Sequence, residues 1–201
     1  MPDQVKGLMA AFAQPNVDTD VIMPKRFLIT ITREGLADGT FADLRFDEDN
    51  NKRPDFVLNQ PPWTNASIMV VGDNFGCGSS REHAVWGLMQ LGIKGVIGTG
   101  FAGIFYDNAR KNGLALPIVS AEVRDELMQS ARDPDAGDCT IDITNRQISV
   151  GSRVHTFDMD DATQTALLEG RDDTLDSLNL ADSILAYESG LKEKMRVNVI
   201  Q

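Results

Sequence analysis

The middle of the chain constrains the fold most, because two units of the same kind follow one another there. Residues 67–72 form an apolar run that is typical of a buried strand, and residues 81–91 carry apolar side chains at helical spacing. The same order of strand and helix returns over residues 95–132. A strand, a helix and a further strand in this order favour a parallel sheet with helices on its faces. The sequence therefore predicts an α/β core over residues 67–133.

The regions on either side of this core have other patterns. Residues 1–66 are rich in Asp, Asn, Pro and Gly around short apolar runs at 8–12 and 27–31, which indicates strands and long loops more than helices. Residues 134–201 predict a small antiparallel section followed by helices. The strands of the second unit and of this section are expected at 95–98, 114–119, 139–144, 147–150 and 153–157, and the helices at 101–111, 121–132, 161–169 and 179–191. We expect one α/β domain over residues 1–201, with a mainly parallel sheet.

Charge and cysteine content exclude some classes of partner. The net charge of −11 argues against nucleic acid and anionic membrane surfaces. Two cysteines, Cys77 and Cys139, are too few for a disulfide framework and fit a reduced compartment. The N-terminus lacks a basic leader, and no stretch approaches 18 apolar residues. We therefore expect a cytoplasmic protein without a membrane span.

The segment that joins the first strand to the first helix has the strongest chemical signal, and we call residues 72–81 the serine–arginine loop. It reads Gly72-Asp73-Asn74-Phe75-Gly76-Cys77-Gly78-Ser79-Ser80-Arg81. Loops at the carboxyl end of a parallel strand usually bind ligands, and Gly76 and Gly78 permit positive φ angles or a close approach of the backbone. Ser79 or Ser80 is expected to cap the helix, and Arg81 adds a fork that fits a carboxylate. The loop predicts a carboxylate or phosphate site, and the alternative is a capped helix with a solvated arginine.

A second glycine-rich segment offers a rival function. Gly98-Thr99-Gly100-Phe101-Ala102-Gly103 matches the dinucleotide-binding pattern, and Glu122 follows at a suitable distance. Only one further strand of the parallel series is expected after it, which is too little for a full dinucleotide fold. Helix packing is the alternative reading of these glycines.

The histidines and cysteines do not predict a metal site. His83 and His155 are far apart in sequence, and neither has a partner at the spacing of metal ligands. Two lone cysteines cannot supply the thiolates that an iron–sulfur cluster needs. Any such cluster must belong to another chain.

Four segments of the chain carry a common pattern, and they are residues 16–20, 24–28, 74–84 and 101–108, with Gly78-Ser79-Ser80-Arg81-Glu82-His83 as the most specific run. In sequence, order and spacing these segments resemble the small subunits of 3-isopropylmalate dehydratases, which contain the swivelling domain of the aconitase superfamily. The resemblance covers about residues 7–188.

This resemblance implies a swivelling β/β/α domain that is active only with a large subunit. In such enzymes the large subunit carries a four-iron four-sulfur cluster, and this chain is expected to bind no cofactor itself. Ser79 resembles the catalytic base, while Ser80 and Arg81 resemble residues that hold a substrate carboxylate, with Gly78 in the same site. The implied reaction converts 2-isopropylmalate into 3-isopropylmalate by loss and return of water, in leucine biosynthesis.

Four further residues are expected at the rim of the active site: Asp18, Asp20, Lys25 and Arg33. Locally, the two aspartates also fit an Asx-type cap at a turn. Residues 25–43 resemble a mobile loop that helps to select the substrate's side chain, and their local reading is a flexible connection.

Departures from the family's usual pattern concern the substrate. Residues 32–36, Arg171, Gly98 and Gly100 differ from what is typical of these small subunits. The loop expected to bind the carboxylate is intact, so a related hydro-lyase acting on another substituted malate, of the methylmalate or citraconate type, is one alternative. A regulatory or assembly module without catalysis is another.

Overall fold

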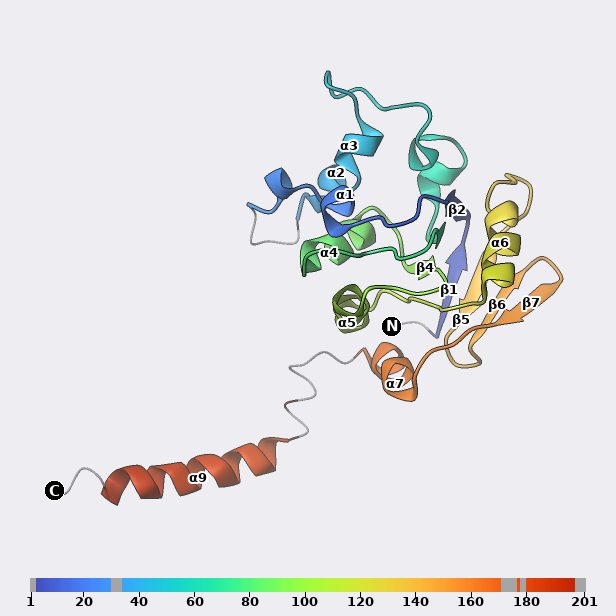
Figure 1. Ribbon diagram of the computed structural model, residues 1–201. Coiled ribbons are helices and arrows are strands. Elements are labelled where there is room, and N and C mark those ends of the chain that lie inside the picture. Colours follow the sequence, from blue (N-terminus) through green and yellow to red (C-terminus); the bar gives the residue numbers. More distant parts are fainter. Residues whose placement is uncertain (1–2, 30–33, 171–176, 178–179, 198–201) are drawn as a thin grey trace. The chain divides into compact units, whose positions relative to one another are not determined.

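The computed structural model describes residues 3–29, 34–170, 177 and 180–197, and these fall into two compact units (Figure 1). The first unit is Met1–Gly170 and holds both sheets. The second is Arg171–Gln201 and contains the helix α9 (Ala181–Val197), which the sequence predicted over 179–191. None of the helices within the described residues is long and apolar enough to cross a membrane.

The parallel sheet has three strands in the order β2-β3-β4. They are β2 (Met9–Phe12), β3 (Ile68–Val71) and β4 (Gly95–Ile97), and all of β3 is buried. Both pairs are parallel, as expected for strands linked by a helical crossover.

The strand predicted at residues 114–119 is wrong as a continuous strand. The segment makes only isolated parallel bridges to the edge of the sheet, at Gly95 with Ala115 and at Gly98 with Ile118. Pro117 lies between the two bridges and has no N–H to donate, so a regular ladder cannot run through it.

The antiparallel sheet is larger than predicted, because it has four strands in the order β1-β5-β6-β7. The strands are β1 (Gln4–Gly7), β5 (Cys139–Asp142), β6 (Gln147–Val150) and β7 (Arg153–Thr156). The three later strands confirm the prediction, and β1 was not predicted. The class is the predicted mixture of helices and sheets, but the parallel sheet does not dominate it.

The chain changes from one sheet to the other at Gly7, since only Leu8 separates β1 from β2. A Cβ atom at Gly7 would lie 2.7 Å from Oγ of Ser67. Glycine therefore allows the close approach that the change of sheet requires.

Four helices of the first unit confirm the prediction closely. They are α4 (Glu82–Gln90), α5 (Gly103–Asn112), α6 (Ala121–Ser130) and α7 (Asp161–Glu169). Asp160 caps α7 by accepting a hydrogen bond of 2.8 Å from the N–H of Thr163.

The N-terminal section contains more helical turns than its composition indicated. The turns are α1 (Thr19–Ile22), η1 (Lys25–Phe27), α2 (Leu36–Gly39), α3 (Ala42–Arg45), η2 (Val57–Asn59) and η3 (Trp63–Asn65). The apolar run at 27–31 is not a strand at Phe27, and residues 30–31 lie outside the described residues. Helices this short are not stable alone, so we attribute them to packing of side chains such as Ile22, Leu36 and Phe41 in the core.

Two apolar cores lie on opposite faces of the parallel sheet, because alternate residues of a strand point to opposite sides. Phe12, Met69 and Val71 face the first core, which also contains residues of α4 and α5. Ile68 and Val70 face the second core, together with residues of α6 and of the antiparallel sheet. Figure 1 shows the same arrangement, with α6 on the side of β5 and β6 and the turns α1–α3 on the side of α4.

Candidate active site

The serine–arginine loop runs alongside the segment that follows β2, at the carboxyl edge of the parallel sheet. The N–H of Asn16 donates to the carbonyl of Asp73 at 2.8 Å, and the N–H of Gly76 donates to the carbonyl of Val17 at 2.8 Å. Asp18 forms a parallel bridge with Cys77. The pairing of β2 with β3 therefore continues beyond both strands and fixes the path of the loop.

Two glycines of the loop have the left-handed backbone that the sequence predicted. Gly76 has a φ of 78° and Gly78 a φ of 90°. A Cβ atom at Gly76 would lie 2.3 Å from Cγ of Phe105, and one at Gly78 would lie 3.3 Å from Cβ of Asp18. Both positions require glycine, for its conformation and at Gly76 also for space.

The predicted serine cap is wrong, because α4 begins later than the sequence suggested. Arg81 is the residue before the first helical turn, and no side chain caps the helix. Arg81 is extended there, with φ −132° and ψ 103°. Ser79 and Ser80 therefore remain outside the helix, and both residues are exposed. Their hydroxyl groups are available to a ligand.

The guanidinium of Arg81 is not solvated, since its side chain is only 10% exposed and forms an ion pair with Asp20. The hydrogen bond from Arg81 within this ion pair is the main reason that the pKa of Asp20 lies below its usual value. A guanidinium has five N–H donors, and the contact with Oδ1 of Asp20 is through Nη1 alone. The arrangement holds Arg81 in place.

Asp18 has the structural role that its local sequence indicated. Its carboxylate accepts a hydrogen bond of 2.8 Å from the N–H of Val21 and so caps α1. The segment that holds this cap also lies against Gly78. Asp18 therefore stabilises the segment that packs against the serine–arginine loop.

Thr19 lies between the two aspartates and contacts the loop at two points, which the sequence did not predict. Its N–H donates to the carbonyl of Cys77 at 2.9 Å, and its hydroxyl donates to the carbonyl of Ser79 at 2.9 Å. The residue is only 2% exposed. The only sequence feature that pointed to Thr19 was its place in the run from Asn16 to Asp20. Taken locally, a threonine at this position predicts no more than the first residue of a turn.

The remaining rim residues are only partly described. Lys25 is exposed, and its charge helps to lower the pKa of Asp20. Arg33 lies outside the described residues, as does the rest of 30–33 in the predicted substrate loop. Arg171 does so too. The structure thus brings Asp20 and Arg81 together and places Lys25 near them.

The second glycine-rich segment supports the first one. We call residues 98–102 the phenylalanine loop, because the space beside Gly98 is filled by Phe101: a Cβ atom at Gly98 would lie 3.1 Å from Cζ of that ring. Thr99 donates to the carboxylate of Asp73 at 2.7 Å, and Arg124 of α6 donates to the same oxygen at 2.9 Å. These contacts favour packing over dinucleotide binding as the role of the glycines.

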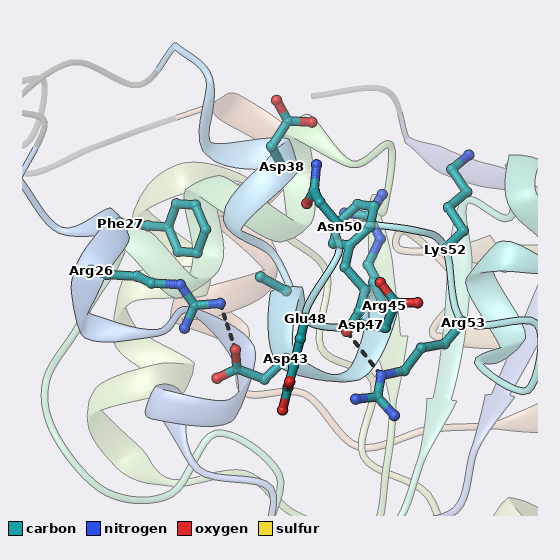
Figure 2. A pocket seen from close by; sticks show the side chains of 12 residues that line it. Arg26, Phe27, Asp38, Asp43, Arg45, Asp47, Glu48, Asn50, Lys52 and Arg53 are labelled. Carbon is teal, nitrogen blue, oxygen red and sulfur yellow. Dashed lines mark hydrogen bonds and ion pairs between the residues drawn. The ribbon is translucent and has the colours of Figure 1, made fainter.

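A hollow in the N-terminal section has no residue in common with the serine–arginine loop. It has a volume of about 820 Å³ and is lined from Arg26 to Arg53 by four acidic and four basic side chains, with Asn50 and two aromatic rings among them (Figure 2). Figure 2 shows Arg26 beside Asp43. Nη2 of Arg26 donates to Oδ1 of Asp43 at 2.5 Å. Arg53 donates from Nε to the carbonyl of Phe46 at 2.8 Å. The hollow is lined by equal numbers of acidic and basic side chains, so it gives no reason to prefer a dianionic substrate.

The described part of the chain does not provide a metal centre. It contains no group of three or more His, Cys, Asp or Glu side chains that could hold a metal ion. Cys139 is fully buried in β5, and burial raises the pKa of its thiol to about 12. Cys77 is free and partly buried. The two thiols therefore do not fit an iron–sulfur cluster within this chain.

Comparisons with known proteins agree with the fold and with the loop. The family model of the aconitase C-terminal domain matches residues 3–122. The small subunit of 3-isopropylmalate dehydratase from Brucella canis is 47% identical over 188 residues, which cover 92% of this chain and 93% of that protein. The corresponding subunit from Brucella anthropi is 47% identical over 189 residues, with the same coverage.

A solved structure extends the agreement to three dimensions. The crystal structure of 3-isopropylmalate dehydratase from Methanocaldococcus jannaschii has 29% sequence identity to this chain and a TM-score of 0.65. The match covers 90% of this chain and 98% of that one. The resemblance and the mixed α/β class expected from the sequence are confirmed. The chain belongs to the aconitase C-terminal domain family and, within it, to the small subunits of 3-isopropylmalate dehydratases.

Proposed function

We propose that this chain, together with a large subunit, converts 2-isopropylmalate into 3-isopropylmalate in leucine biosynthesis. The observation that carries the proposal is the arrangement of two exposed serines directly before an arginine that Asp20 holds in place. Its relatives at 47% identity are small subunits of the enzyme that the reaction defines. The free thiols of Cys77 and Cys139 fit a cytoplasmic location.

Each residue of the loop has a separate role in this proposal. Deprotonated Ser79 takes a proton from the carbon next to the one that bears the hydroxyl group. The electron pair of that C–H bond forms the double bond, and the hydroxyl leaves with the electron pair of its C–O bond and takes up a proton from solvent to become water. Addition of water in the opposite orientation completes the exchange of positions. Ser80, Arg81 and the backbone at Gly78 hold a carboxylate of the substrate throughout.

The large subunit supplies what the loop lacks. A four-iron four-sulfur cluster in that subunit would provide a Lewis acid for the departing hydroxyl group. The described residues of this chain hold no such centre. Asp18, Asp20, Lys25 and Arg33 are proposed for the rim of the shared site.

The isolated chain should not catalyse the reaction. Interaction with a helix N-terminus is worth roughly 0.3–2 kcal/mol, and one pKa unit corresponds to about 1.4 kcal/mol. Ser79 lies before the first turn of α4, and the charge of Arg81 is already paired with Asp20. The loop alone therefore lowers the pKa of the serine hydroxyl by too little to make it a base near neutral pH.

The decisive experiment is reconstitution with the large subunit from the same source under anaerobic conditions. The complex is assayed on a panel of 2-substituted malates, with each subunit alone as the control. We expect turnover of 2-isopropylmalate by the complex and none by this chain alone. Preference for a methyl-substituted malate would instead support the related hydro-lyase. A stable complex without turnover of any malate contradicts the proposal and favours a module without catalysis.

A further inference from the structure

We propose that Thr19 is a positioning residue for this reaction, and that its buried hydroxyl fixes the backbone of Ser79. The inference rests on the proposed function, because Ser79 is the base in it. Thr19 itself is too deeply buried to touch a substrate, at 2% exposed. It acts through the carbonyl group that its hydroxyl contacts.

The two hydrogen bonds of Thr19 lie on either side of Gly78. The N–H of Thr19 reaches the carbonyl of Cys77, and its hydroxyl reaches the carbonyl of Ser79, both at 2.9 Å. Gly78 lies between these carbonyls with a φ of 90°. A Cβ atom at that position would be only 3.8 Å from Oγ1 of Thr19. Thr19 therefore holds the loop at the residue whose backbone rotates most freely.

The position of Ser79 depends on this contact more than the position of Arg81 does. Ser79 is exposed and lies outside the helix, whereas Arg81 is nine-tenths buried and bound to Asp20. A general base must lie within hydrogen-bonding reach of the proton that it removes, and a displacement of about 1 Å can reduce a rate about a hundredfold. Loss of the hydroxyl of Thr19 should therefore lower kcat more than it raises KM.

The test compares Thr19→Val with Thr19→Ser in the reconstituted complex. Valine keeps the shape of threonine but lacks the hydroxyl, so we expect kcat to fall about tenfold, equivalent to about 1.4 kcal/mol, with KM changed by less than about twofold. Serine keeps the hydroxyl but loses a buried methyl group. Thr19→Ser should therefore unfold at a lower temperature and still retain kcat within about twofold.

A second measurement uses this chain alone and does not need turnover. Hydrogen exchange of the amides of Thr19 and Gly76, which donate to the carbonyls of Cys77 and Val17, should be faster in Thr19→Val than in the unchanged chain or in Thr19→Ser. Thr163→Val is the matched control, because Thr163 is also buried and lies in α7, in another part of the first unit. The control should leave both kcat and this exchange unchanged.

The outcomes separate this inference from the proposed function. An unchanged kcat and unchanged exchange in Thr19→Val overturn the positioning role. So does an equal loss of kcat in both variants that follows their loss of thermal stability. If the unchanged complex does not convert 2-isopropylmalate, the proposed function fails, and the exchange measurement alone decides whether Thr19 holds the loop.

Discussion

The serine–arginine loop and the phenylalanine loop start from neighbouring strands of one sheet and lead into similar helices, yet they present different groups. The first exposes Ser79 and Ser80 beside a held arginine. The second turns Phe101 back over its own Gly98 and directs Thr99 to Asp73 of the first loop. One loop is thus open to a ligand, and the other supports it.

The conformation of the glycines explains this difference better than their number does. Gly76 and Gly78 have left-handed backbones, which turn the chain outward before α4. Gly98 and Gly100 do not have positive φ angles, and α5 follows after a short connection. Phe105 of that helix packs beneath Gly76 and the ring of Phe75, with 5.7 Å between the two ring centroids. A glycine-rich junction therefore indicates a ligand site only where its backbone leaves side chains exposed.

The largest effect should come from removing a hydroxyl from one loop and not from the other. Ser79→Ala in the reconstituted complex should lower kcat by about 10²–10⁴, because a general base contributes about that much. Thr99→Val in the phenylalanine loop should change kcat by less than about threefold, since it loses only a supporting hydrogen bond. Steady-state kinetics of both variants test the contrast. Equal effects would show that the two loops do not differ in role.

The next effect concerns stability and uses one glycine from each loop. Gly76→Ala should lower the free energy of unfolding by about 2–4 kcal/mol, since the new Cβ requires a strained left-handed backbone and meets the ring of Phe105. Gly100→Ala should change it by less than about 0.5 kcal/mol, because open space surrounds that position. Urea unfolding of both variants measures the difference. A stable Gly76→Ala variant would contradict the packing described here.

A smaller effect is expected from two arginines that are buried to a similar extent. Arg81→Lys should lower kcat/KM by a factor of about 10–100, since a hydrogen bond to a charged group is worth about 1.5–3 kcal/mol and lysine lacks the planar fork. Arg124 is 13% exposed and pairs with Asp73, so Arg124→Lys is the control. We expect the control to retain kcat/KM within about threefold. A loss of kcat/KM confined to Arg124→Lys would indicate that the carboxylate site does not lie at the serine–arginine loop.

The smallest effect is a pH dependence of stability at the contact between the two loops. The hydrogen bond from Thr99, followed by Arg124, holds the pKa of Asp73 below its usual value of 3.8. Because the pKa is lower in the folded state, the charge stabilises the fold above the unfolded pKa, and this contribution is lost as the pH falls through the folded pKa. Asp73→Asn should therefore be less stable than the unchanged chain at neutral pH, and the difference should become smaller at a pH below 3.8. Urea unfolding at both pH values checks this, and a difference that grows in acid would contradict it.

Local sequence predicted the parts of the site that depend on neighbouring residues. The strand and the need for glycine at positions 76 and 78 follow from the run between Ser67 and Arg81, because a buried strand must end before a polar loop. The serine cap failed, since helix boundaries depend on one or two residues and the chain offers two adjacent serines. Arg81, which pairs with Asp20, is instead the last residue before the helix and has an extended conformation.

Contacts between distant residues could not be predicted in this way. The hydroxyl of Thr19 and the carbonyl of Ser79 are 60 positions apart, and no local pattern records their meeting. Pro117 interrupted a strand whose apolar residues otherwise fitted, because the hydrophobic pattern does not register a missing N–H donor. The strand β1 was missed for the same reason, because it is four residues long and its partner β5 begins only at Cys139.

That pairing also sets the order in which the protein can assemble during its synthesis on the ribosome. Among the described strands β1 is made first, and it has no partner in the antiparallel sheet until β5 emerges, with 138 positions between Gln4 and Asp142. The parallel sheet needs only residues 9–97, so it can form while β1 is still unpaired. The edge of β1 is therefore exposed longest in the nascent chain, and this is the segment that chaperones would have to protect from pairing with other chains.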